Sequence, residues 1–134
     1  MIDISLEGSE SWPETMAMIA VMEREGVETV WLASHLFQRE PIARAAAILS
    51  ASRSLSVALM AISPYTVHPV YAAMAAATLD EMFPGRVTLC LGVGAPRDLQ
   101  AAGVDAPKPL STLREAIAGT RALFSGEAVA HDGA

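Results

Sequence analysis

The sequence MAISPYTVHP at residues 60–69, followed by ATLDE at 77–81 and GRVTLCLGVG at 85–94, carries the strongest indication of the fold. An apolar run ends in a loop that contains two prolines, and a helical stretch then leads through a glycine turn into a second apolar run. This part of the chain therefore predicts a strand, a loop, a helix, a tight turn and a second strand.

The same alternation of strand and helix extends over the rest of the chain. Strands are predicted at residues 2–6, 29–33, 55–61 and 87–91, and helices from Ser11 to about Glu25, from Pro41, from Pro69 to about Met82, and from Ser111 to about Leu123. Four such units imply an α/β fold with a parallel sheet and right-handed crossovers. A small doubly wound sheet and half of an eight-stranded barrel both fit, because periodicity does not separate them.

Turn and cap residues support the predicted helix ends. Ser11 and Glu14 have the spacing of a capping box, and Gly26 is suited to the position after the first helix. Ser111 is expected to cap the last helix, after a long loop that follows residue 91.

Composition excludes several classes of function. Of the 134 residues, 52% are hydrophobic and 18% are charged, and the net charge of −6 with a single lysine, Lys108, argues against a nucleic-acid partner. The lone Cys90 excludes an internal disulfide and a thiolate zinc site, and it suits a cytoplasmic protein. The N-terminal residues do not read as a signal peptide, and no apolar stretch reaches the roughly 20 residues of a membrane span.

Two residues at predicted strand ends are candidates for chemistry. His35 follows the second strand, where barrel active sites lie, and could act as a general acid or base or contact a cofactor. The residues alone favour a histidine that only caps a loop. Glu7 ends the first strand and could project into the same region, although an exposed loop carboxylate is the commoner case. His68 is interpreted as structural, and His131 as solvated.

Other polar motifs have simpler interpretations. Gly92 and Gly94 follow a strand, but Arg97 stands where a dinucleotide fingerprint needs a small residue, so a glycine pair beside a bound ring system is preferred. The pair Asp80-Glu81 is expected to form an ion pair with Arg86. Cys90 is expected to be a small buried residue, and no metal-ligand spacing is convincing.

The order and spacing of several passages resemble the bacterial-luciferase-like superfamily, and within it methylene-tetrahydromethanopterin reductase and its relatives. The passages that carry the resemblance are residues 23–35, 63–69, 77–94, 108–110, 114–115 and 126–129. The resemblance implies a (β/α)8 barrel whose members bind coenzyme F420 (a deazaflavin) or FMN at the C-terminal mouth. It also implies an oxidoreductase that catalyses hydride transfer or monooxygenation on a small-molecule substrate.

Residues matched to the family's motifs, together with Glu7 at the end of the first strand, give a predicted site. The resemblance assigns the catalytic role to His35, and the expected cofactor-binding residues are Glu7, Ser34, Ala61, Ile62, Ser63, Gly92 and Gly94. It also implies a non-proline cis peptide bond at Ala61–Ile62. Ser34 stands where the F420 reductases commonly have Asp, so this chain lacks an acid next to His35.

Length separates this chain from a complete barrel, which takes about 250 residues. The sequence Asp132-Gly133 looks like a turn that is interrupted. Residues 1–134 are therefore expected to form a single partial domain, the N-terminal half of a barrel. Its first and fourth strands would be open edges, so the chain is expected to form a homo-oligomer or to pair with a second half-barrel. The alternative to an enzyme is a non-catalytic half-barrel that only associates.

Overall fold

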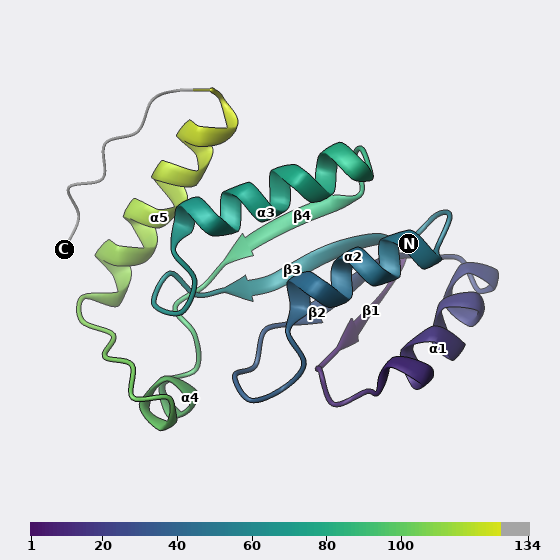
Figure 1. The fold of residues 1–134 in the computed structure, drawn as a ribbon, viewed down its shortest axis with the longest axis horizontal. Helices are drawn as coiled ribbons and strands as arrows, with labels where there is room; N and C mark the ends of the chain where they lie inside the picture. The colour runs from purple at the N-terminus through teal and green to yellow at the C-terminus, as the bar shows by residue number, and fades with distance from the viewer. Residues whose placement is uncertain (127–134) are drawn as a thin grey trace.

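The computed structural model describes residues 1–126, in which four parallel strands alternate with helices (Figure 1). The strands are β1 (Ile2–Leu6), β2 (Val27–Ala33), β3 (Ser56–Ile62) and β4 (Val87–Leu91). The helices are α1 (Trp12–Arg24), α2 (Pro41–Ala51), α3 (Pro69–Met82), the short α4 (Pro96–Ala101) and α5 (Pro109–Phe124). The expectations for His131, for the turn at Asp132-Gly133 and for residues 127–129 lie outside the described residues.

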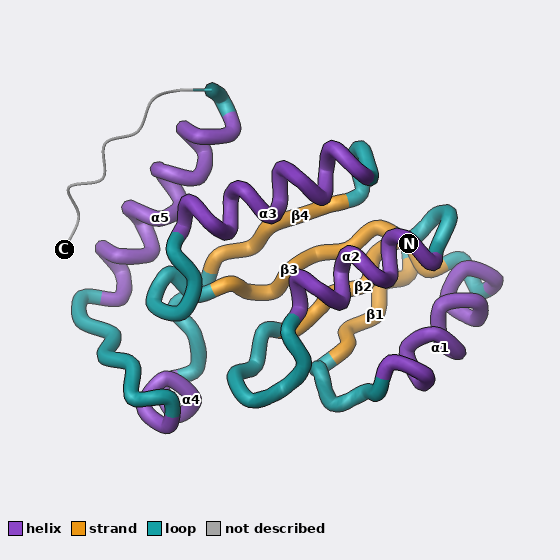
Figure 2. Tube along the Cα trace, in the orientation of Figure 1, coloured by secondary structure: helices purple, strands orange, loops and turns teal. Residues whose placement is uncertain are grey.

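Strand order separates the two architectures that the sequence left open. The order is β1-β2-β3-β4, and each strand pairs in parallel with its neighbour in the chain. Right-handed crossovers between consecutive strands place the connecting helices on one face of the sheet. Figure 2 shows α2 and α3 lying over the strands on the same side. The prediction of a partial (β/α)8 barrel is therefore confirmed, and a doubly wound sheet, whose order reverses, is excluded for this part of the chain.

Proline marks the beginning of each helix in residues 1–126. At α1 the predicted capping box forms, because the Glu14 carboxylate accepts the N–H of Ser11 at 2.7 Å while the Ser11 hydroxyl accepts the N–H of Glu14 at 3.4 Å. Gly26 follows the helix with φ of +77°, a conformation that glycine adopts without strain.

The beginning of α5 and the whole of α4 differ from the prediction. Pro109 rather than Ser111 sets the start of α5, with Lys108 at the N-cap position. Ser111 lies inside the first turn, and its hydroxyl donates to the Lys108 carbonyl at 3.0 Å. The sequence analysis assigned residues 96–101 to a loop because six residues carry too little periodicity to indicate a helix; Pro96 was the available signal.

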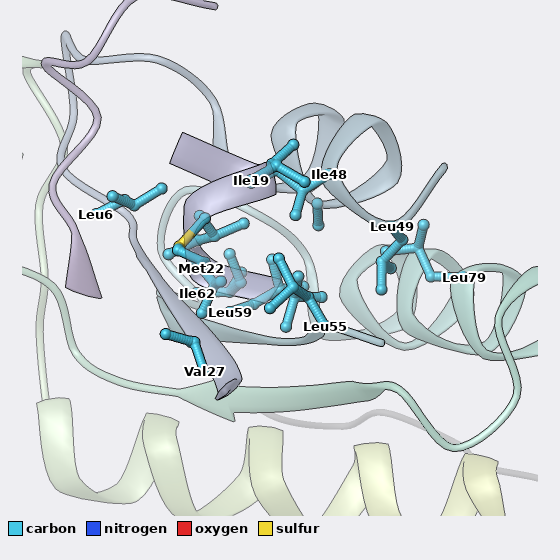
Figure 3. Close-up of a cluster of buried hydrophobic side chains, with 14 of the residues drawn as sticks. Leu6, Ile19, Met22, Val27, Ile48, Leu49, Leu55, Leu59, Ile62 and Leu79 are labelled. Carbon is cyan, nitrogen blue, oxygen red and sulfur yellow. The ribbon is translucent and has the colours of Figure 1, made fainter. Parts of the chain in front are cut away.

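The hydrophobic core lies between the helix-covered face of the sheet and helices α1, α2 and α3 (Figure 3). Most fully buried side chains come from the two central strands and from α2; they include Val30, Leu32, Ile48, Val57 and Leu59. The edge strands are different, since most residues of β1 and β4 stay exposed or half-buried. The exposure of β4 explains why Cys90, which was expected to be buried, is half-buried.

Arg86 does not form the predicted ion pair with Asp80 or Glu81. Its guanidinium donates to the Leu55 carbonyl at 2.7 Å and to the Ser52 hydroxyl at 2.8 Å. The Asp80 carboxylate instead accepts the N–H of Gly85 at 2.9 Å, closing the turn before β4. The arginine is used at this end because unpaired carbonyls at and beyond the C-terminus of α2 need donors.

No helix among residues 1–126 combines the length and the hydropathy needed to cross a membrane.

Candidate active site

The predicted site residues lie at the end of the sheet where the parallel strands finish. We call this end the carboxyl edge, to distinguish it from the edge strands β1 and β4. Glu7 follows β1, Ser34 and His35 follow β2, Ser63 follows β3, and the two glycines follow β4. Polar residues on loops at the carboxyl ends of parallel strands are how barrel proteins build their sites. The structure divides these residues into two groups, one at β1 and β2 and one at β3 and β4.

The first group is a contact between Glu7 and His35. His35 Nε2 lies 2.9 Å from Glu7 Oε2, and Ser5 donates its hydroxyl to Glu7 Oε1 at 3.0 Å. The register of β1 and β2 pairs Leu6 with Leu32, so both strands end at the same level and their following residues meet. The side chains remain 59% and 47% exposed, which leaves the pair open to a bound molecule.

Hydrogen bonding favours the ionised form of Glu7. The bond from His35 lowers the pKa of Glu7 below its ordinary value, and the bond from Ser5 adds to this effect. Glu7 is thus a carboxylate at neutral pH and can only accept a hydrogen bond. His35 Nε2 must then carry a hydrogen in this contact, because a carboxylate can only accept, and Nδ1 is the other ring nitrogen, free of this contact.

Glu7 therefore places a carboxylate against His35, at a different position from the acid that is absent at Ser34. Ser34 brings no acid, as expected, but the acid comes from a different strand. Sequence spacing gave no signal for the contact itself, because 28 residues separate the two side chains and only the strand register brings them together.

The second group holds the ends of β3 and β4 together. The Ser63 hydroxyl donates to the Val93 carbonyl at 2.7 Å and accepts the N–H of Tyr65 at 3.2 Å. Gly92 donates its N–H to the Ile62 carbonyl at 3.1 Å. These bonds show Ser63 and Ile62 as residues that join two loops.

The glycines after β4 allow this close approach. A Cβ on Gly92 would lie 2.8 Å from the Cβ of Ala61, a distance that side chains do not tolerate. Gly94 has φ of +93°, and a Cβ there would lie 3.3 Å from Ser63. Glycine is therefore needed at position 92 because of Ala61, and at position 94 because of its positive φ, with Ser63 close by.

The cis peptide bond lies one residue earlier than predicted, between Met60 and Ala61 rather than between Ala61 and Ile62. The pairing of β3 with β4 shifts its register between Leu59 and Ile62. Ile62 is back in the ladder, where it pairs with Leu91, so the observed and the predicted bond both lie within this irregular stretch.

Ser34 lies near the second group. Its backbone N–H donates to the Met60 carbonyl at 3.0 Å. Ser34, Ser63 and Gly94 line a pocket of about 10 Å³, together with Thr66 and Leu99. Such a pocket holds about one water molecule, so a larger ligand would have to lie above it. A larger groove of about 500 Å³ runs between α3, β4 and α5, away from this edge.

Three further residues support the site and were missed by the sequence analysis: Glu10, Arg39 and Arg44. Arg39 donates to the carbonyls of Gly8 and Ser9 at 3.1 and 2.9 Å, and Arg44 donates to Glu10 at 3.2 Å. Both arginines come from the segment after His35, and both hold the loop after Glu7. Nothing in their local sequence distinguishes them from surface arginines.

A sequential parallel sheet with its polar residues at the carboxyl ends of the strands defines the barrel class of α/β proteins. Residues 3–134 match the luciferase-like monooxygenase family. The chain belongs to this family, so the resemblance found in the sequence is confirmed.

Individual proteins of known name are similar to this chain in sequence or in structure. A 5,10-methylenetetrahydromethanopterin reductase of Methanolobus tindarius is 30% identical over 83% of this chain and 34% of its own length. The structure of a coenzyme F420 dependent tetrahydromethanopterin reductase from Methanopyrus kandleri superposes with a TM-score of 0.84 at 22% identity, over 98% of this chain and 42% of that one. The oxygenating constituent of 3,6-diketocamphane monooxygenase of Pseudomonas putida, a type II Baeyer–Villiger monooxygenase in complex with FMN, gives 0.79 at 19% identity, over 96% and 40%.

The chain is much shorter than the proteins it matches. The chain spans 34% of the reductase relative and 42% and 40% of the two solved structures. It corresponds to a part of these proteins.

Proposed function

We propose that this chain supplies part of the active site of an oxidoreductase that uses coenzyme F420 or FMN for hydride transfer or monooxygenation on a small-molecule substrate in the cytoplasm. The observation that carries the proposal is the contact of His35 with Glu7 at the carboxyl edge of the sheet. Membership of the luciferase-like family and the cofactors named for the two solved structures support it.

The donor set at this edge fits a ring system with a polar rim. The Ser34 hydroxyl bonds no other residue in the described part of the chain, so it can donate to or accept from a ring carbonyl or nitrogen. Met60 is 38% exposed and offers an apolar, polarisable surface beside it. The nearby cation Arg39 already binds two carbonyls, so a phosphate group would need other partners.

The ring would be held by Ser34, by Met60 and by the backbone around Ser63 and Gly94. When bound, a deazaflavin or flavin supplies the two-electron chemistry that protein side chains lack, and FMN also supports reaction with oxygen. This chain's own contribution is proton handling at His35. Its Nδ1 takes up or releases the proton, while the Glu7 carboxylate orients the ring through Nε2 and stabilises the positive charge that forms.

Cofactor titration is the direct test. The purified chain is titrated with coenzyme F420 and with FMN, and cofactor fluorescence is followed. We expect saturable binding at tens of micromolar or below, for the chain alone or mixed with a second half-barrel. The variant Ser34→Ala should weaken this binding, whereas Arg24→Gln, at the opposite edge of the sheet, should not. Absence of binding in both arrangements would refute the proposal.

The partner of this chain follows from its open sheet edges. Most residues of β1 and β4 are exposed or half-buried, and Leu89 and Phe124 line the groove of about 500 Å³ beside β4. Unpaired strand edges favour association with other strands. We propose that two copies of this chain, or this chain and a second half-barrel, pair along β1 and β4. The alternative function is a half-barrel that associates in this way without catalysis. Light scattering tests the pairing, since a monodisperse monomer at high concentration contradicts it.

A further inference from the structure

A buried arginine lies behind the Glu7–His35 pair. Arg44, on α2, is only 7% exposed, although arginine is rarely buried without a partner. One of its terminal nitrogens donates to Glu10 Oε2 at 3.2 Å and to the Thr15 hydroxyl at 3.3 Å. Thr15 is fully buried and donates in turn to the Ser11 carbonyl at 2.9 Å. The arginine therefore ties α2 to the first turn of α1 and to the loop before it.

Glu10 connects the buried arginine to the loop that carries Glu7. Its Oε1 accepts the backbone N–H of Glu7 at 3.1 Å, and its Oε2 accepts that of Gly8 at 2.9 Å. The carboxylate thus folds back over the preceding residues and fixes the backbone from which the Glu7 side chain projects.

We propose that Arg44 and Glu10 are positioning residues, which set the position of Glu7 and through it the orientation of the His35 ring. Their catalytic consequence rests on the proposed function, whereas their effect on the loop does not. The two residues touch neither the expected ligand nor the reacting atoms. Their contribution is a rigid loop, because a displaced Glu7 would leave His35 without the acceptor that fixes its tautomer.

Charge and geometry make arginine and glutamate suited to this role. Burial raises the pKa of Glu10, but the backbone N–H groups that it accepts and the Arg44 guanidinium outweigh burial and lower that pKa below its ordinary value. Glu10 is therefore ionised at neutral pH and keeps all its acceptor sites. One terminal nitrogen of the guanidinium reaches both Glu10 and Thr15, and the guanidinium keeps its charge at any pH the protein meets.

A pair of matched variants separates positioning from ordinary stability. Glu10→Ala removes the acceptor of the Glu7 and Gly8 N–H groups. Glu23→Ala removes a carboxylate that accepts the N–H groups of Arg53 and Ser54 in the same way, at 2.6 and 2.9 Å, but at the opposite edge of the sheet. Amide hydrogen exchange of the full chain reports each loop, and a 13C NMR titration reports the Glu7 carboxyl group.

In Glu10→Ala we expect protection of the Glu7 and Gly8 amides to fall roughly tenfold or more, as for loss of bonds to a charged acceptor. The pKa of Glu7 should rise toward its ordinary value as its contact with His35 loosens, because that contact is the largest cause of the lowered pKa and outweighs the lost repulsion from Glu10, which raises it. Arg44→Met should produce the same changes, and Arg44→Lys should restore part of the protection. Glu23→Ala should leave Glu7 and Gly8 unchanged.

The outcomes are distinguishable from those of the cofactor titration. Unchanged protection of Glu7 and Gly8 in both Glu10→Ala and Arg44→Met would overturn the positioning role, whatever the chain binds. Equal losses of Glu7 and Gly8 amide protection in Glu10→Ala and Glu23→Ala would also overturn it, because the effect would then be general destabilisation. Where turnover is measurable, the positioning variants should lower kcat about tenfold with KM nearly unchanged, since they disturb proton transfer and not the binding surface.

Discussion

His35 and Glu7 lie at the ends of neighbouring strands, and their contact gives the histidine a defined tautomer. Nε2 faces the carboxylate at 2.9 Å, so the proton that a reaction would use is handled at Nδ1. The pair is about half-exposed, so we expect its loss to affect the stability of the fold little.

His35→Ala should therefore reduce activity far more than stability. General acid–base groups contribute about 10²- to 10⁴-fold to a rate, so we expect a loss of kcat in this range. Ser34→Asp should raise cofactor-dependent activity if a second acid beside His35 is what the site lacks. Both are measured as turnover with coenzyme F420 or FMN, with thermal unfolding as the control. Equal activity in wild type, His35→Ala and Ser34→Asp would mean that neither residue serves catalysis.

The charge state of Glu7 gives a second prediction. Its pKa is lowered first by the bond from His35 and then by that from Ser5. Replacing His35 with Ala should raise the pKa of Glu7, and Ser5→Ala should raise it less. A 13C NMR titration of the Glu7 carboxyl group between pH 2 and 7 measures both shifts. If Ser5→Ala has the larger effect, the hydrogen bond with the histidine is not the main cause.

Most helix ends could be predicted from the sequence because caps and turns depend on residues that are neighbours in the chain. The box of Ser11 and Glu14, the prolines at helix starts and the positive φ of Gly26 all depend on a few neighbouring residues, and they form as predicted. The six-residue α4 was missed because one and a half turns show no periodicity. The choice between a barrel and a doubly wound sheet depended on strand order, which no local pattern records.

The sequence predicted which residues lie in the candidate site, but not the hydrogen bonds between them. The predicted strand ends placed Glu7 and His35 near one edge, yet the hydrogen bond between them depends on the register of β1 and β2. The roles of Arg44 and Glu10 depend on burial and on partners 29 and 34 residues away, which sequence spacing does not show. The cis bond was misplaced by one residue, since the register shift of β3 becomes visible only in the paired sheet.

Glu23 predicts a dependence of stability on pH. Its carboxylate accepts N–H groups of Ser54 and Arg53, and these bonds lower the pKa of Glu23 below its ordinary value. A carboxyl group whose pKa is depressed by folding stabilises the fold above its ordinary pKa, and this contribution disappears as the pH falls through the lowered value. Glu23→Gln should thus have a lower Tm than wild type at pH 7, with a difference that shrinks toward pH 3. A constant difference across this range would argue against an ionised Glu23 in the loop.

Gly92 offers the most direct test of how the ends of β3 and β4 pack. A methyl group at this position would lie 2.8 Å from the Cβ of Ala61, so Gly92→Ala should destabilise the chain by about 1–3 kcal/mol, as overpacking does. Removing the opposing methyl group in the double variant Gly92→Ala/Ala61→Gly should restore much of the loss. Gly119→Ala is the matched control, because Gly119 lies within α5 with nothing within 4 Å of the added Cβ. There the same change should stabilise the chain by roughly 0.5–1 kcal/mol through helix propensity. Chemical denaturation of the four proteins measures these differences, and a Gly92→Ala variant as stable as Gly119→Ala would mean that the two strand ends do not approach as closely as described.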